Sequence, residues 1–499
     1  MTSDELIQPK QESQFVIWAL LWTVITNFGG KFVNLLTTIV LAWILVKEDF
    51  GLAGYALVFV TFIEILEGFG VESALVYHDE EEDLLVNAFW ISAFMGVFIT
   101  LAVYFSAPVA AWIFDDDRAI PLVQALSATF FFTGLRIVPK ALLSRRMQFK
   151  LLAIPELFKV IFKGVAAISL AIYGFGPWSL IWSVVIGMAV EMFVLWMLVD
   201  WRPVFRFVFK VEKIKPLLSY GSGLIGMSIV GTLIANIDYV FVGRLLGASA
   251  LGVYMLGFRL PTLLISPIIQ SLSKVLFPLS ARKQTDHASL VQGWKYSIRY
   301  ISILCVPLGV GMAAVSAAMV PALFGDKWIE TIPVVAAIAI QNVLIAFAWH
   351  TGDIYKAIGR IKPLFWLNVI QLLITLPALY FAASVFGTVG AVAFAHVVAA
   401  ALMVFVRLFD MSRVMSISLK EISWLLFHPI LAGTVMAAVV VMVDRSLASL
   451  DYSVWIRLLV DIAVGGVVYL LMTWLTMREE SQTAIEQLSE SFGRRRGTQ

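Results

Sequence analysis

Long apolar runs fill most of this chain, and only short breaks separate them. A helix needs about 20 mostly apolar residues to cross a bilayer. Breaks such as Gly174-Phe175-Gly176-Pro177 and Phe324-Gly325-Asp326-Lys327 have the composition that ends helices. We therefore expect an all-α polytopic membrane protein with about 14 transmembrane helices. The runs cover residues 15–46, 51–76, 87–114, 119–140, 154–174, 178–199, 218–246, 250–278, 297–323, 331–356, 364–385, 388–411, 422–443 and 454–477.

Composition supports lipid as the solvent of this chain. Hydrophobic residues make up 60% and charged residues 14% of the sequence, whereas soluble domains carry about 25% charged residues. The single cysteine, Cys305, excludes an internal disulfide and a cysteine metal site, and we expect it to be a core thiol. The net charge of +2 gives no reason to expect a nucleic-acid partner. Residues 1–14 lack the pattern of a signal peptide, so the first run is expected to stay as a span.

Basic residues predict the orientation of the chain. If the N-terminus is cytoplasmic, 24 of the 36 Lys and Arg lie in or next to the tails and cytoplasmic loops, and 6 lie in the outer loops. Cytoplasmic loops of membrane proteins carry such an excess of bases. Both termini are therefore predicted to be cytoplasmic, which requires an even number of spans.

The chain is predicted to contain two related halves. Residues 200–216 interleave aromatic and basic side chains, as in a segment on an anionic leaflet, although an ordinary basic loop has the same composition. ILVKEDFGLAGYAL near residue 44 resembles RLLGASALGVYMLG near residue 244, an offset near 200. This fits a parallel duplication. The predicted parts are an N-tail (1–14), an N-lobe (15–199), a linker (200–217), a C-lobe (218–411), two further spans (412–477) and a basic tail (478–499).

Charged residues inside the apolar runs are the candidate functional residues. Such residues are costly in lipid, so they usually face a cavity or a partner. Bases suit the phosphates of an anionic head group. Acids among them can hold a coupling ion or gate the path. The candidates for substrate binding are Lys31, Arg136, Lys159, Lys163, Arg259 and Lys274, and the candidates for ion coupling or gating are Glu64, Glu67, Asp238 and Asp353.

Two simpler interpretations stay open for these candidates. Five of them lie within two turns of the predicted cytoplasmic end and can extend to the interface, namely Arg136, Lys159, Lys163, Lys274 and Asp353. The deeper candidates can form structural ion pairs between helices. His396, alone in an apolar run, is expected to be a hydrogen-bonded core histidine.

The sequence shows no enzyme signature. Asp115-Asp116-Asp117 resembles a metal-binding acid run of glycosyltransferases, but it stands alone in a short loop, and a solvated turn is the simpler interpretation. There is no phosphate-binding glycine loop and no zinc-like spacing of His or Cys. We therefore expect a non-enzyme without a metal or cofactor.

Several stretches resemble the polysaccharide exporters and flippases of the multidrug/oligosaccharidyl-lipid/polysaccharide superfamily, in particular the Wzx type. They follow the family order over most of the chain. They are FGLAGYALVFVTFIEILEGFGVESALV from Phe50, PKALLSRRMQFKLLAIPELF from Pro139, GFGPWSLIW from Gly174, NIDYVFVGRLLGASALGVYMLGFRL from Asn236, VLFPLSARKQTD from Val275 and FGDKWIETIPVV from Phe324.

The resemblance implies two six-helix lobes around a central cavity and alternating access. It implies a bacterial inner-membrane transporter of undecaprenyl-diphosphate-linked oligosaccharides, driven by a proton or sodium gradient. Membrane lipids, glycosyltransferases and a polymerase of the same pathway would be its partners. The alternatives are a cation-coupled multidrug exporter, which would have a more acidic cavity, and a membrane glycosyltransferase or polymerase, which needs a long outer loop. A structural scaffold would give the buried charges no purpose.

Overall fold

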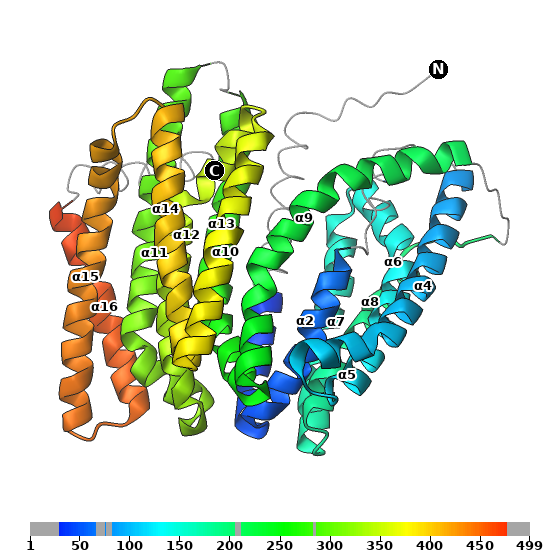
Figure 1. Cartoon of the computed structure of the whole chain (residues 1–499), viewed down its shortest axis with the longest axis horizontal. Coiled ribbons are helices and arrows are strands. Elements are labelled where there is room, and N and C mark those ends of the chain that lie inside the picture. Colours follow the sequence, from blue (N-terminus) through cyan, green and yellow to red (C-terminus); the bar gives the residue numbers. More distant parts are fainter. Residues whose placement is uncertain (1–28, 66–74, 76–81, 205–210, 283–285, 477–499) are drawn as a thin grey trace, which may run out of the picture. The chain divides into compact units, whose positions relative to one another are not determined.

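The computed structural model describes residues 29–65, 75, 82–204, 211–282 and 286–476, and these form helices joined by short connections (Figure 1). Among the described residues of the first contact unit, residues 1–252, the helix Gly29–Ile44 is followed by seven helices and the first turn of an eighth. These are α2 (Lys47–Glu64), α4 (Glu82–Phe114), α5 (Ala119–Leu126), α6 (Ala128–Arg145), α7 (Phe149–Ile172), α8 (Pro177–Leu198), α9 (Val211–Leu246) and the first turn of α10 (Ala248–Arg282).

The second contact unit, residues 253–499, contains the rest of α10 and all later helices. Within it, α11 packs against α12, α15 and α16, and α12 packs against α14. Its elements after α10 are α11 (His287–Phe324), the 3-10 turn η1 (Asp326–Thr331), α12 (Ile332–Ala357), α13 (Ile361–Phe381), the π-helical turn η2 (Ala382–Phe386), α14 (Val389–Val414), α15 (Leu419–Ser449) and α16 (Val454–Thr476).

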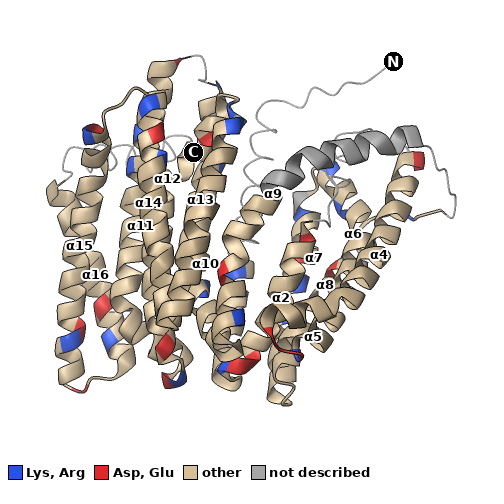
Figure 2. Cartoon of the chain, viewed as in Figure 1, with Lys and Arg blue, Asp and Glu red and all other residues tan. Residues whose placement is uncertain are grey.

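The all-α membrane fold predicted from the sequence is confirmed. Every one of the fourteen predicted runs contains a helix, and in the described residues eleven helical segments are long and apolar enough to span a membrane. Large apolar side chains are exposed along them, for example Phe105 on α4, Phe405 on α14 and Leu470 on α16. Figure 2 shows long uncharged stretches in the same helices. This surface suits lipid, and the chain is a multi-pass membrane protein. The count of fourteen spans stays a prediction.

The predicted breaks lie where the helices end. Gly174 and Gly176 have φ angles of 80° and 52°, in the region that side chains disfavour, and Pro177 is the first residue of α8. Gly325 likewise ends α11. Residues 200–204, the described part of the predicted linker, lie against α4. There Nε1 of Trp90 donates a hydrogen bond to the Val204 carbonyl oxygen (3.2 Å). Helix α9 begins at Val211, inside the range predicted as linker.

The predicted repeat brings two related helices into backbone contact. A β-carbon on Gly51 of α2 would lie 1.7 Å from the carbonyl oxygen of Ala248, and one on Gly252 of α10 would lie 2.0 Å from that of Lys47. The two contacts are reciprocal: the same shift of 201 residues relates Lys47 to Ala248 and Gly51 to Gly252. Small residues allow such close crossings in membranes. The contact follows the offset found in the sequence.

Candidate functional site

A group of charged side chains lies inside unit 1, where three helices meet. Nη1 of Arg136 on α6 is 2.7 Å from Oε1 of Glu191 on α8, and Nζ of Lys159 on α7 is 3.1 Å from Oε2 of the same carboxylate. Glu191 is 3% exposed, so its charge is almost removed from solvent. We call Arg136, Lys159 and Glu191 the α6–α8 cluster. It joins two of the predicted substrate-binding bases through one acid.

A glycine on α8 allows α7 to place its bases beside this acid. Lys159 and Lys163 are four residues apart and therefore share a face of α7. A β-carbon on Gly187 would lie 3.2 Å from the β-carbon of Lys163 and 3.3 Å from the carbonyl oxygen of Lys159. Gly187 is one turn before Glu191 on α8. Lys163 therefore lies about one turn beyond the α6–α8 cluster, on the same pair of helices.

Three other described candidates of unit 1 lie on other helices. Lys31 is half-buried on the helix Gly29–Ile44, which packs against α7 where Gly164 meets Thr37. Glu64, the last residue of α2, is within reach of the positive charge of Arg136. Asp238 is buried on α9 and has an interaction partner within the protein. Glu67 lies outside the described residues.

The candidates of unit 2 lie on α10 and α12. Arg259 and Lys274 are exposed on α10. Asp353 of α12 is buried, with Nδ1 of His350 at 3.4 Å and Nζ of Lys356 at 3.8 Å from its carboxylate oxygens. The hydroxyl of Ser273, next to Lys274 in the chain, also faces Asp353. The roles predicted for all these residues stay predictions.

The predicted site residues did not include Glu191, nor a second cluster formed by Asp444, Arg457 and Asp461. Glu191, the centre of the α6–α8 cluster, lies within the apolar run 178–199. In unit 2, Nη2 of Arg457 on α16 is 2.7 Å from Oδ1 of Asp444 on α15, and Asp461, four residues after Arg457, is fully buried beside them. We call Asp444, Arg457 and Asp461 the α15–α16 cluster. The sequence could have pointed to Glu191 only as an acid inside an apolar run. Its partners, Arg136 and Lys159, are far from it in the sequence.

The acidic run after α4 is paired with bases. Arg118 binds Asp116 (2.8 Å) and Glu48 of α2 (2.6 Å), and Arg244 of α9 binds Asp115 (3.2 Å). The hydrogen bonds from Arg118 hold the pKa of Asp116 below its ordinary value. The described residues contain no group of three or more His, Cys, Asp or Glu that could hold a metal ion. The run is thus part of an ion-pair network that links α2, α4 and α9.

Two predicted core residues are confirmed. His396 is buried on α14, and its Nδ1 is 3.1 Å from Nε2 of Gln341 on α12. Cys305 is fully buried on α11. Neither residue is placed at the charged clusters.

The chain is similar to known proteins along most of its length. Residues 40–333 match a family described as polysaccharide biosynthesis protein. The chain is 26% identical over 419 residues to the teichuronic acid biosynthesis protein TuaB of Bacillus subtilis (strain 168), over 82% of this chain and 85% of the relative. It is 25% identical over 473 residues to the succinoglycan biosynthesis transport protein ExoT of Rhizobium meliloti (strain 1021), over 92% of both chains.

A solved structure has a similar fold. It is that of the lipid II flippase MurJ in an inward closed conformation, with a TM-score of 0.75 over 92% of this chain and 99% of that chain. The identity is 16%, so this similarity concerns the fold alone.

Proposed function

The chain belongs to the polysaccharide biosynthesis protein family, and on this premise we propose that it carries lipid-linked oligosaccharide repeat units across the bacterial inner membrane. The α6–α8 cluster, in a chain of this family, is the observation that carries the proposal. It holds two bases and one acid inside apolar helices. A third base, Lys163, follows one turn along α7. Lys159 also pairs with Glu156 at 3.1 Å, so an anionic ligand would bind these bases by exchanging with carboxylates.

The chemistry of these bases fits a lipid-linked diphosphate. The guanidinium of Arg136 can bind phosphate oxygens in a forked geometry, and the ammonium groups of Lys159 and Lys163 act as point charges. Glu191 holds the two nearest bases in place while no ligand is bound. A diphosphate entering the site would exchange with this carboxylate for the same donors. Binding and release of the head group would therefore not leave a base without a partner.

Full-length similarity supports transport rather than catalysis. The relative ExoT, which matches over 92% of both chains, is named as a transport protein. The proposed substrate is an undecaprenyl-diphosphate-linked repeat unit, and the proposed direction is from the cytoplasm to the periplasm. Alternating access of the two predicted lobes would be driven by a proton or sodium gradient. Glycosyltransferases and a polymerase of the same pathway would act before and after this step.

The proposal assigns further roles to the charged candidates. Lys31, Arg259 and Lys274 would extend the binding path for the head group beyond the α6–α8 cluster. The acids Glu64, Glu67, Asp238 and Asp353 would bind the coupling ion or gate the path. Both termini would be cytoplasmic, as the distribution of bases predicts.

Flipping in vesicles tests the proposal. The purified protein is reconstituted with a fluorescent undecaprenyl-diphosphate oligosaccharide, and a membrane-impermeant quencher reports how fast the labelled lipid changes leaflet. We expect movement faster than in protein-free vesicles, and faster still with an ion gradient. Movement no faster than in empty vesicles, together with gradient-driven efflux of a cationic dye, would overturn the proposal in favour of drug export.

A pair of variants tests the site. Replacing both Arg136 and Lys159 by Gln removes the bases around Glu191, and in the fraction that stays folded in detergent we expect flipping to slow by about tenfold or more. The unpaired carboxylate should also lower the unfolding midpoint. The control is Lys150→Gln, an exposed base in the first turn of α7 with the same change of charge. Equal flipping by the double variant and the control would exclude the α6–α8 cluster as the head-group site.

A further inference from the structure

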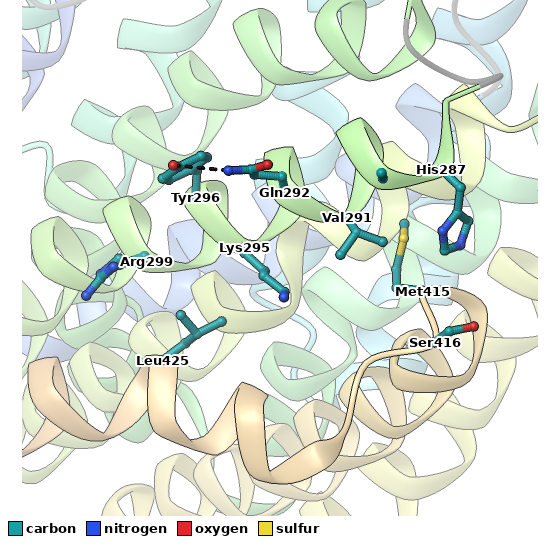
Figure 3. Close-up of a pocket in the computed structure, with 10 residues that line it drawn as sticks. His287, Val291, Gln292, Lys295, Tyr296, Arg299, Met415, Ser416 and Leu425 are labelled. Atoms are coloured by element: carbon teal, nitrogen blue, oxygen red, sulfur yellow. Dashed lines mark hydrogen bonds between the residues drawn. The ribbon is translucent and has the colours of Figure 1, made fainter.

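A cavity of about 630 Å³ lies in unit 2, away from the predicted site residues. Its walls are the first turns of α11, the connection from α14 to α15 and the second turn of α15 (Figure 3). The polar side chains that line it are His287, Gln292, Lys295, Tyr296, Arg299 and Ser416. A cavity of this volume is large enough for a small ligand or the polar part of a larger one.

Basic side chains form a stripe along this cavity. His287, Lys295 and Arg299 follow one another at spacings of eight and four residues, so they share one face of α11. The ammonium group of Lys295 is ion-paired with Glu421, which lies in the first turn of α15. Gln292 donates a hydrogen bond to the hydroxyl of Tyr296 (3.3 Å). Two permanent bases thus face one acid, and nearly all the other polar groups can donate hydrogen bonds, which favours an anion.

The cavity lies at the level of lipid head groups. The apolar run of α11 begins at residue 297, whereas the helix begins at His287, about ten residues earlier. About 20 residues are enough to cross the hydrocarbon layer. The first turns of α11 therefore extend into the interfacial region. The distribution of bases along the chain predicts that this is the cytoplasmic side.

Exposed aromatic side chains border the cavity on both helices. Tyr296 and Tyr300 of α11 are 49% and 46% exposed, and Trp424 of α15 is 63% exposed. Trp424 stacks on Phe427, which is also exposed. Aromatic rings collect at the membrane–water interface, where they contact both head groups and acyl chains. The ligand that suits this cavity therefore has an anionic head and an apolar part that lies along α11 and α15.

We propose that this cavity binds the head group of an anionic phospholipid. The phosphate lies between Lys295 and Arg299, where it competes with Glu421 for Lys295. The acyl chains lie against the exposed aromatic faces of α11 and α15. Basic pockets between transmembrane helices bind anionic head groups in this way. The aromatic border distinguishes this ligand from a free phosphate ion, which would gain nothing from it. The proposal does not depend on the transport activity.

Native mass spectrometry of the full-length protein in detergent tests this inference. The probes are phosphatidylglycerol, phosphatidylcholine, undecaprenyl diphosphate and inorganic phosphate, each added over a range of concentrations. We expect the wild-type chain to retain phosphatidylglycerol well above phosphatidylcholine. Replacing both Lys295 and Arg299 by Gln should weaken phosphatidylglycerol binding by about thirtyfold, since each base near an anionic surface contributes about a fivefold change in affinity.

Two further variants make the test decisive. Lys420→Gln is the matched control, because this exposed base is next to Glu421 in sequence but does not line the cavity, and it should leave binding within about twofold. Glu421→Gln should strengthen binding by releasing Lys295, and it keeps the inference testable if the double variant unfolds. The inference would be overturned by an equal loss with Lys420→Gln, by unchanged binding with Glu421→Gln, by full displacement with inorganic phosphate, or by preference for undecaprenyl diphosphate at these residues.

Discussion

The two buried charged clusters have opposite balances. The α6–α8 cluster of unit 1 holds one acid between two bases on different helices. The α15–α16 cluster of unit 2 holds one base, Arg457, beside two acids, and Asp461 is fully buried. Both lie in apolar helices, so both must be compensated locally. The bases of the first can exchange a carboxylate for an anionic ligand, whereas the second holds more acids than bases.

Only the α6–α8 cluster suits an anionic ligand, whereas the α15–α16 cluster suits a structural role. An anion can enter the α6–α8 cluster and take over the donors that Glu191 holds. At the α15–α16 cluster, an anion would meet two carboxyl groups, and Arg457 already binds Asp444 through both Nε and Nη2. Both nitrogens donate to the same oxygen, Oδ1 of Asp444, and these two charge-assisted hydrogen bonds join the two helices. The α15–α16 cluster therefore ties the last two helices together.

The largest expected effect comes from removing the shared acid of the α6–α8 cluster. Glu191→Gln leaves Arg136 and Lys159 close together without a counter-charge, and breaking a buried ion pair costs about 3–5 kcal/mol. We expect a lower unfolding midpoint in detergent and loss of flipping. Glu156→Gln is the control: this carboxylate also pairs with Lys159 but is half exposed, and exposed pairs contribute about 0–1 kcal/mol. Similar midpoints for the two variants would mean that the cluster is not a buried unit.

Removing the base of the α15–α16 cluster should have the next largest effect. Arg457→Gln breaks two charge-assisted hydrogen bonds to Asp444, and we expect a loss of roughly 2–3 kcal/mol of unfolding free energy. Flipping should persist in the folded fraction. Asp461→Asn should change stability little, because the Arg457–Asp444 pair is kept. If Arg457→Gln abolished flipping without lowering stability, the division between a ligand cluster and a structural cluster would be wrong.

A glycine substitution tests whether unit 1 is also held by backbone contact. Gly51→Ala would put a methyl group against the Ala248 carbonyl, and overpacking costs about 1–3 kcal/mol. Gly466→Ala in α16 of unit 2 is the control, because a β-carbon there would meet nothing within 4 Å. That variant should be neutral or slightly stabilising. If both variants kept the wild-type midpoint of thermal unfolding, the close approach of Gly51 to Ala248 would be contradicted.

The smallest effect concerns acid and the ion-pair network after α4. Arg118 lowers the pKa of Asp116, whose ordinary value is 3.8. The resulting stabilisation is complete above that value and is lost as the pH falls through the lowered pKa of the folded protein. Arg118→Gln should therefore have a lower unfolding free energy than wild type at neutral pH, and the difference between the two proteins should shrink as the pH falls below 3.8. A difference between the two proteins that stayed constant from pH 6 to pH 2.5 would exclude this pair as the cause.

Long apolar runs and helix-stop residues were enough to predict the fold. Apolar runs are a direct requirement of a bilayer, and Gly174, Gly176 and Pro177 act through their own backbone geometry. Helix ends beyond the lipid were missed, because α11 begins with ten residues of mixed polarity before its apolar run. A count of apolar residues does not detect such extensions.

The site was only partly predictable for a different physical reason. An ionised residue in an apolar run reveals that a partner or cavity exists, but the partner is chosen by tertiary packing. Arg136 and Glu191 are 55 positions apart, and Gly187 brings their helices together with α7. The cavity beside Lys295 depends in the same way on how α11 meets α15. No local pattern in the sequence specifies these meetings.

The reciprocal crossing of α2 and α10 has a mechanical consequence. Each helix places a carbonyl oxygen where the other would carry a β-carbon. Sliding either helix by one residue would press a side chain against a backbone, whereas a small change in crossing angle keeps both contacts. The contact between α2 and the first turn of α10 thus permits tilting of these two segments and opposes sliding of one along the other.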